Sequence, residues 1–277
     1  GAIAGAEGNA VRALAQAEPF SPYRARVARR MPEFVQKLEA EGPEKALEDC
    51  LVRIGAAPRV AATMTPRATT TQTRGATTTL EAPMKTLRRA KEAAHLAIAA
   101  ADLAGIWTLD QVVERITQLA DASVQAALKL AIREAWATGR LGETRDSDEL
   151  PGLFVLAMGK MGARELNYSS DIVLIVLFDL DVLPVEGARA KEAMLRLTRD
   201  LVRILEERTE DGYVFRTDLR LRPDPASTAP AISTQFALGY YESVGQNWER
   251  MAHIKARVCA GDEATGKAFL EELAPYV

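Results

Sequence analysis

The sequence predicts an α+β protein in which helices precede and follow one compact group of strands. Apolar residues recur at helical spacing between residues 87 and 132, whereas short apolar runs of strand length occupy residues 153–159 and 171–179. The expected order is helices, then strand, strand, helix and strand, then helices again. This order is typical of an α+β chain.

The bulk composition is that of an ordinary globular chain. Of its 277 residues, 48% are hydrophobic and 26% are charged, which suffices for one large or two smaller domains. The net charge of −3 argues against a nucleic-acid partner, and no apolar run is long enough to span a membrane. Cys50 and Cys259 form no CxxC pair, so we expect two reduced thiols in a cytoplasmic protein. The start at Gly1, without a signal-peptide pattern, suggests a fragment or a processed chain.

Residues 1–57 are expected to form an N-terminal helical segment. Three prolines mark the expected boundaries of its short helices: Pro22, Pro32 and Pro43. Residues 58–83 differ in composition, because residues 63–79 contain nine threonines and no acidic residue. This segment has neither a helical nor a strand period, so a threonine-rich linker or irregular loop is expected there.

Residues 84–277 are expected to form the main domain, with flanking helices around a sheet core at about residues 150–225. Its first helix should stop near Gly105, and its second should begin after Thr108, a suitable N-cap. His95 on the first helix has no second metal-ligating residue at a suitable spacing. We interpret it as a packing or surface residue.

The third strand is expected at YVFRTDLRLR (213–222), which alternates at period two. Such a strand would place four charged residues on one face: Arg216, Asp218, Arg220 and Arg222. Further helices are expected near 188–209, 233–246, 247–260 and 263–274.

Two candidate phosphate-binding turns come from the strands. In Gly159-Lys160-Met161-Gly162, the glycines permit a tight turn in which backbone N–H groups approach a phosphate. Many strand-to-helix turns contain two glycines, so on its own this turn is best interpreted as ordinary. In Ser169-Ser170-Asp171, hydroxyls suit phosphate oxygens and the carboxylate suits Mg²⁺. Alone, this triplet is best interpreted as a loop that ends in a strand.

Asp218 and the arginines around it form the third candidate feature. An edge strand with cross-strand ion pairs would explain this pattern without any ligand. Beside a strand headed by Asp171, however, the same residues suit a polyanionic substrate. The carboxylates would hold Mg²⁺ while the arginines neutralise phosphate charge during phosphoryl or nucleotidyl transfer.

Five segments in the right order carry a family resemblance. They are SPYRARVARRMPEF (21–34), MKTLRRAKEAAHLAIAAADLAGIW (84–107), GKMGARELNYSSDIVLIVLFD (159–179), YVFRTDLRLRPD (213–224) and YYESVGQNWERMAHIKARVCAGD (240–262). They resemble the bifunctional glutamine synthetase adenylyltransferase/adenylyl-removing enzymes. The resemblance covers most of the chain except about residues 58–83.

The resemblance implies a nucleotidyltransferase fold of the DNA polymerase β type, with a small mixed sheet flanked by helical segments. One such domain preceded by helices resembles the N-terminal half, which removes AMP from a glutamine synthetase tyrosine by phosphorolysis and releases ADP. Implied partners are glutamine synthetase, the PII regulatory protein, a nucleotide (ADP or ATP) and phosphate, and the implied cofactor is Mg²⁺. The chain would thus act in nitrogen metabolism.

The resemblance also assigns roles to individual residues. Asp171 and Asp218 match the first and third metal-binding, catalytic aspartates. The phosphate- and nucleotide-binding positions would be Gly159, Lys160, Gly162, Ser169, Ser170, Arg220 and Arg222. Trp248 lies in the matching WER segment, where we expect it to be buried beside an ion pair.

The sequence departs from the family at the second aspartate of the Asp-x-Asp pair. Positions i and i+2 on a strand point the same way, but residue 173 is valine and offers no oxygen. Asp179 has the same facing but lies roughly 26 Å further along a strand. Two interpretations therefore stay open: an adenylyl-removing enzyme, or a catalytically impaired regulatory or glutamine-synthetase-binding module of the same fold.

Overall fold

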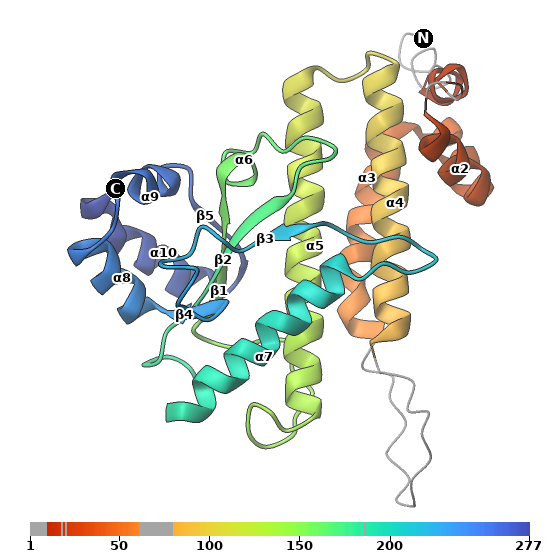
Figure 1. Cartoon of the computed structure of the whole chain (residues 1–277). Helices are drawn as coiled ribbons and strands as arrows, with labels where there is room; N and C mark the ends of the chain where they lie inside the picture. Colours follow the sequence, from red (N-terminus) through yellow and green to blue (C-terminus); the bar gives the residue numbers. More distant parts are fainter. Residues whose placement is uncertain (1–9, 18, 20, 61–79, 186) are drawn as a thin grey trace, which may run out of the picture.

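The computed structural model describes residues 10–17, 19, 21–60, 80–185 and 187–277 (Figure 1), so the threonine-rich segment 63–79 lies outside the described residues. The helices are α2 (Pro22–Arg30), α3 (Pro32–Val60), α4 (Glu81–Leu103), α5 (Leu109–Ala137), α6 (Gly159–Gly162), α7 (Gly187–Glu206), α8 (Thr234–Ser243), α9 (Asn247–His253), α10 (Glu263–Leu273) and the 3₁₀ turn η2 (Ala274–Tyr276). The strands are β1 (Leu153–Met158), β2 (Ile172–Phe178), β3 (Thr217–Asp218), β4 (Ala231–Ser233) and β5 (Arg257–Gly261).

Prolines begin the N-terminal helices, as expected. Pro22 opens α2, Pro32 opens α3, and α3 is broken at Gly42 (φ 80°) immediately before Pro43. The expected linker at 58–83 is too long at both ends, because α3 extends to residue 60 and α4 begins at residue 81. Both helices continue past the change in composition because their ends still bury apolar side chains: Ala57, Leu80 and Met84.

The boundary between α4 and α5 follows local signals in the sequence. Gly105 has φ 65°, and the adjacent amides of Gly105 and Ile106 donate to the carbonyls of Asp102 and Ala101, which closes α4. Thr108 then caps α5 through a reciprocal pair of hydrogen bonds with Gln111, of 2.9 and 3.4 Å. Both predictions are confirmed.

The sheet is small and mixed, with the order β3-β2-β1-β5. β1 is antiparallel to β2 and to β5, whereas β3 and β4 both pair in parallel with β2. The α+β class is therefore confirmed. The expected sheet core at 150–225 is too short, since β4 and β5 lie beyond it, and the helix expected at 247–260 ends at residue 253. β5 exists because it pairs with β1, about a hundred residues earlier in the chain, which no local period reveals.

The strand expected at 213–222 is reduced to Thr217–Asp218. β3 pairs with the start of β2, and β4 pairs with its end, so the two share one edge of β2. The chain between them therefore has to leave the sheet at about residue 219. As a consequence, Arg220 and Arg222 do not continue a strand face with Asp218.

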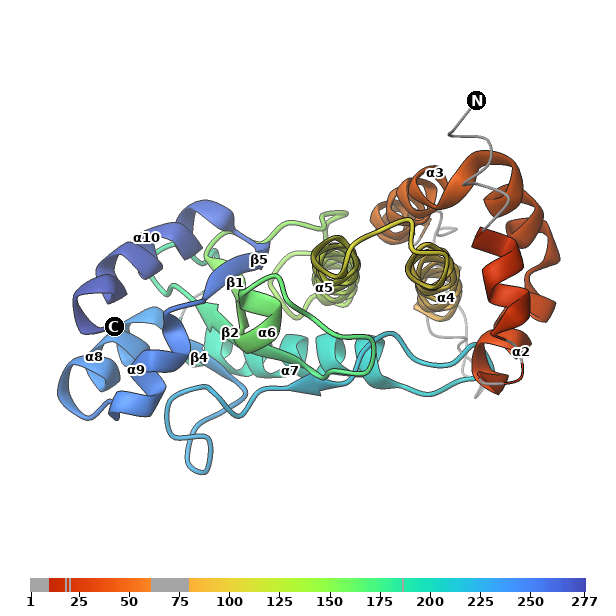
Figure 2. The same ribbon diagram turned by 90° about the horizontal axis from the view of Figure 1, so that it is seen from above.

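Helices cover both faces of the sheet. Figure 2 shows the sheet between α5 on one side and α8 to α10 on the other. On the α5 and α7 side, alternate residues of β2 (Ile172, Leu174 and Val176) join a core that extends from Ala10 to Ala260. On the other side, Ile175 and Leu177 of β2 meet a smaller cluster of aromatic residues: Phe154, Tyr241 and Phe269. The N-terminal helices thus share the larger core with the sheet.

Among the described residues, none of the helices combines the length and the apolar character that crossing a bilayer requires.

Candidate active site

Asp171 and Asp218 lie at the same end of two adjacent strands. Asp171 directly precedes β2, and Asp218 ends β3, which is parallel to β2 with Val173 opposite Asp218. The Cα atoms of the two aspartates are therefore roughly 8 Å apart, one strand spacing across and two residues along. β3 is held in place by Glu206 at the end of α7, whose carboxylate accepts from the amide and hydroxyl of Thr217 at 2.6 and 2.7 Å. The structure thus brings together the two predicted catalytic residues.

Each aspartate is paired with an arginine. Arg216 donates from Nε to Asp171 at 2.5 Å and from its terminal nitrogen to the carbonyl of Ser169 at 2.7 Å. Arg220 forms a forked pair with Asp218, at 2.7 Å for the shortest contact, and its backbone amide also donates to this carboxylate at 2.9 Å. The Arg220 guanidinium holds the pKa of Asp218 below its ordinary value. Both carboxylates therefore accept hydrogen bonds that a ligand or a cation would have to share.

Val173 occupies the position of the second aspartate in the expected Asp-x-Asp pair, next to Asp171 and Asp218. Its Cα is the register partner of that of Asp218, so the two side chains lie next to each other on one face of the sheet. Val173 packs against the smaller core cluster with Ile175 and Met158. The missing oxygen is thus replaced by an apolar contact at the rim of this core.

Two carboxylates are enough for one Mg²⁺ ion but not for a pair of ions. Mg²⁺ keeps several waters and is commonly bound through one or two carboxylates plus substrate phosphates. Within the described part of the chain, no group of three or more His, Cys, Asp or Glu side chains is placed to hold a metal. The donor set of Asp171 and Asp218 therefore fits a single, largely hydrated ion.

The candidate phosphate-binding turn is the short helix α6, which follows β1. Gly159 has φ 54° and open space where a Cβ would project, whereas a Cβ on Gly162 would lie 2.2 Å from the carbonyl oxygen of Lys255. Gly162 is therefore required for close packing beneath residue 255, which differs from the predicted contact with phosphate. Lys160 is exposed, and its ammonium group makes no hydrogen bond or ion pair to any described residue, so this group is available for an anion.

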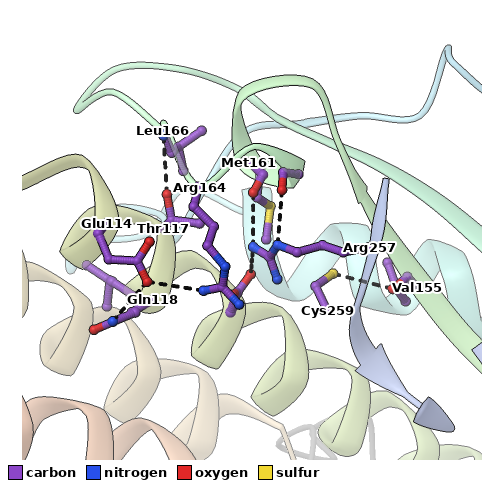
Figure 3. A network of polar contacts seen from close by, with 12 residues as sticks. Glu114, Thr117, Gln118, Val155, Met161, Arg164, Leu166, Arg257 and Cys259 are labelled. Atoms are coloured by element: carbon purple, nitrogen blue, oxygen red, sulfur yellow. Dashed lines mark hydrogen bonds and ion pairs between the residues drawn. The ribbon is translucent and has the colours of Figure 1, made fainter. Parts of the chain in front are cut away.

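A polar network holds this turn against α5 (Figure 3). Arg257 of β5 donates to the carbonyls of Met161 and Gly162 at 2.9 and 3.3 Å, and to Asp121 of α5 at 2.8 Å. Burial raises the pKa of Asp121, and the neighbouring Arg257 guanidinium opposes that shift. No local pattern predicts this anchor, because the spacing of apolar residues places residue 257 in a helix over 247–260.

The next part of the loop is tied to the same helix. Leu166 donates its amide to Thr117 Oγ1 at 3.2 Å, and Arg164 pairs with Glu114 at 3.1 Å (Figure 3). These contacts fix the loop that leads from α6 to Ser169, Ser170 and Asp171.

Ser169 is exposed and Ser170 is half-buried, and neither hydroxyl makes a hydrogen bond to a described residue. Both hydroxyls are therefore available to donate to a ligand, and their phosphate-binding role stays a prediction. Close to them, His95 packs edge-on against Tyr168 and Phe215, with ring centroids 6.2 and 6.0 Å away. The interpretation of His95 as a packing residue is confirmed.

Arg220 and Arg222, the two arginines predicted to bind phosphate, have different surroundings. Arg220 is 83% exposed beside Asp218, a position compatible with phosphate binding. Arg222 instead donates to four backbone carbonyls of the loop between β3 and β4: those of Leu219, Pro225, Thr228 and Ala229. Its guanidinium thus closes the loop that leaves the sheet, and the geometry does not support the predicted phosphate contact.

Trp248 was expected to be buried, and this prediction is wrong, since 56% of it is exposed. The buried residues of α9 are Glu249 and His253. The Glu249 carboxylate accepts from the Tyr240 hydroxyl at 3.0 Å and from the amide of Gln246 at 2.8 Å. This inward contact sets the rotation of the helix and turns Trp248 outward. Arg216, which pairs with Asp171, is a site residue that was not among the predicted catalytic or phosphate-binding residues. Strand alternation nevertheless places it on the same face as Asp218.

Known proteins resemble this chain along most of its length. A family model described as glutamate-ammonia ligase adenylyltransferase matches residues 11–272. The bifunctional glutamine synthetase adenylyltransferase/adenylyl-removing enzyme of Caulobacter vibrioides is 46% identical over 267 residues, 95% of this chain and 25% of the relative. The protein of the same name from Brucella suis is 44% identical over 93% of the chain, and that from Bradyrhizobium sp. (strain BTAi1) is 53% identical over 70%. The chain thus spans about a quarter of the length of these curated relatives.

Proposed function

The chain belongs to the glutamate-ammonia ligase adenylyltransferase family, and from this premise we propose that it removes AMP from adenylylated glutamine synthetase. In this reaction a phosphate oxygen attacks the phosphorus of the AMP–tyrosine ester. The new P–O bond gives ADP, and the tyrosine oxygen leaves and takes up a proton. The observation that carries the proposal is the placement of Asp171 and Asp218 at one end of the parallel strands β2 and β3.

The charges around the two aspartates suit such a transfer. Arg220 and Lys160 are exposed and positive, and they would bind the attacking phosphate and the nucleotide phosphates. The hydroxyls of Ser169 and Ser170 would donate to the same oxygens. Asp171 and Asp218 would hold Mg²⁺, which neutralises charge on the transferred group when it is bound. A nucleotidyltransferase fold of the DNA polymerase β type, PII as a partner and a cytoplasmic setting belong to the same proposal.

The alternative function is a binding or regulatory module of the same fold, without turnover. Its motivation is the apolar contact of Val173 at the register partner of Asp218. In such a module the ion pairs Arg216–Asp171 and Arg220–Asp218 would shape a surface rather than a reaction centre.

Replacement of Asp171 by alanine tests the enzymatic proposal. We expect the chain to form ADP from adenylylated glutamine synthetase, phosphate and Mg²⁺, and Asp171→Ala to lower this rate at least a hundredfold, since positioned charge contributes on that scale. Asp179→Asn is the matched control, because Asp179 lies at the opposite end of β2 and bonds to Gln235. Equal rates for the wild type and Asp171→Ala would contradict the proposed mechanism.

Val173→Asp separates the enzyme from the module. The new carboxylate would stand directly beside Asp218, where two like charges repel unless a cation lies between them. We therefore expect Mg²⁺ to raise the melting temperature of Val173→Asp more than that of the wild type or of Val173→Asn, and ADP formation to increase. Retained binding of glutamine synthetase with no gain in either readout would favour the module.

A further inference from the structure

A cavity of about 740 Å³ lies between the end of α2, both halves of α3 and the start of α4. Its lining contains none of the candidate active-site residues. A volume of this size is within the range of small-molecule sites. The cavity therefore has room for an organic ligand in a part of the chain that the proposed reaction does not use.

The cavity concentrates positive charge in a chain whose net charge is −3. Four cationic residues line it, namely Arg30, Lys37, Arg53 and Arg89, against the two carboxylates Glu33 and Glu92. Glu92 is only 6% exposed, and burial raises its pKa.

The four cations are not equally engaged. Arg30 and Arg89 both donate to the buried Asp211, at 3.3 and 3.0 Å, and Lys37 bonds to Asp49. Arg53 of α3 is exposed, and its guanidinium makes no hydrogen bond or ion pair to any described residue. Its planar guanidinium, which lines the cavity with five free donors, matches the oxygens of a carboxylate or a phosphate.

We propose that this cavity binds a small organic polyanion, with at least two phosphate or carboxylate groups, through Arg53 and the cations around it. One anionic group would bond to Arg53, and a second would reach the guanidinium groups of Arg30 and Arg89. The cations come from three separate helices, so a ligand with a single charge would leave most of them unused. The site is separate from the proposed AMP-removing centre and does not depend on that activity.

Titration calorimetry of the 277-residue chain without Mg²⁺ tests the proposal, with pyrophosphate and citrate as probes. We expect at least one of them to bind with one-to-one stoichiometry, and Arg53→Ala to weaken binding about tenfold, since charge-assisted hydrogen bonds contribute on that scale. Arg59→Ala is the matched control, because Arg59 is exposed on the same helix and does not line the cavity. Its affinity should stay within about twofold of the wild type. Circular dichroism verifies that the variants fold.

The two probes identify the chemistry of the ligand. Binding of pyrophosphate alone assigns a phosphorylated ligand, and binding of citrate alone or of both extends the class to carboxylates. The proposal is overturned if neither probe binds, if Arg53→Ala binds as well as the wild type, or if Arg59→Ala weakens binding equally. It is also overturned if Lys160→Ala, in the candidate active site, removes binding that Arg53→Ala leaves intact.

Discussion

Two of the regions in which charged side chains form polar contacts differ in their access to solvent. The first, which we call the buried seam, lies between α4 and the segment 207–215: Arg88, Lys91 and Asp211 are 2, 6 and 2% exposed. The second is the open end of β2 and β3. There the side chains of Arg216 and Asp171 are each 50% exposed, and that of Arg220 is 83% exposed.

The same chemistry has different consequences in these two regions. In the buried seam, the buried guanidinium of Arg88 donates twice to the carbonyl of Glu207, and displacement of that carbonyl would leave a buried charge without these bonds. The buried carboxylate of Asp211 accepts from Arg30 and Arg89, so loss of these donors leaves a buried charge with fewer partners. At the open sheet end, water screens the pairs, and either partner is able to exchange for a ligand. The buried contacts therefore stabilise the loop that leads into β3. The exposed pairs leave Asp218, at the end of β3, accessible to a ligand.

Arg88→Ala should have the largest effect on stability. It removes two hydrogen bonds to the carbonyl of Glu207 and leaves a space in the buried seam, so we expect a loss of about 3 kcal/mol in the free energy of unfolding. Urea denaturation followed by circular dichroism measures it. Arg216→Ala, which removes an exposed pair, should shift the midpoint several-fold less. Equal shifts of the urea midpoint for the two variants would contradict the difference between buried and exposed contacts.

Lys91→Met should have the next largest effect, and one that depends on pH. Burial lowers the pKa of Lys91 from 10.5 to about 8. Between these values the unfolded chain binds more protons than the folded chain, so wild-type stability should rise with pH, and below pH 8 the penalty for burying the charge is complete. Lys91→Met should therefore gain about 2 kcal/mol at pH 7, after subtraction of the lost contacts with the rings of Tyr213 and Phe215.

The measurement for Lys91→Met is urea denaturation at pH 7, 9 and 10.5. The advantage of the variant should shrink steadily over this range and vanish at the top of it. An advantage that stays constant with pH would show that the buried amine is not the source of the difference.

Arg220→Ala should have the smallest effect on stability and a local effect on ionisation. The guanidinium that lowers the pKa of Asp218 is lost, so this pKa should rise toward its ordinary value, as followed by carbon NMR of the carboxyl groups. In the wild type, the contribution of Asp218 to stability is present above its unfolded pKa and is lost as the pH falls through its folded pKa. The variant should therefore have a slightly lower denaturation midpoint than the wild type at pH 7, and this small difference should disappear as the pH falls through the folded pKa of Asp218. An unchanged pKa of Asp218 would contradict the pairing.

Local chemistry fixes several features that are legible in the sequence. Pro22, Pro32 and Pro43 begin helices because proline fits the first turn, and Gly105 and Thr108 separate α4 from α5 because their conformation and hydroxyl act on neighbouring amides. Residues 169–171 mark the start of the strand that carries the candidate active site. The sequence also shows directly that residue 173 is valine and has no side-chain oxygen.

Contacts between distant residues decided the rest. β5 depends on β1, and the shortness of β3 depends on β4 competing for the same edge of β2, so neither has a local signature. Gly162 packs against the carbonyl of residue 255 for the same reason. Arg222 binds carbonyls of its own loop, which forms because β3 ends where the chain leaves the sheet. Residue type and spacing thus determined which groups the site contains, including valine at position 173. Strand register, which side-chain packing across the sheet sets, determined that position 173 lies beside Asp218.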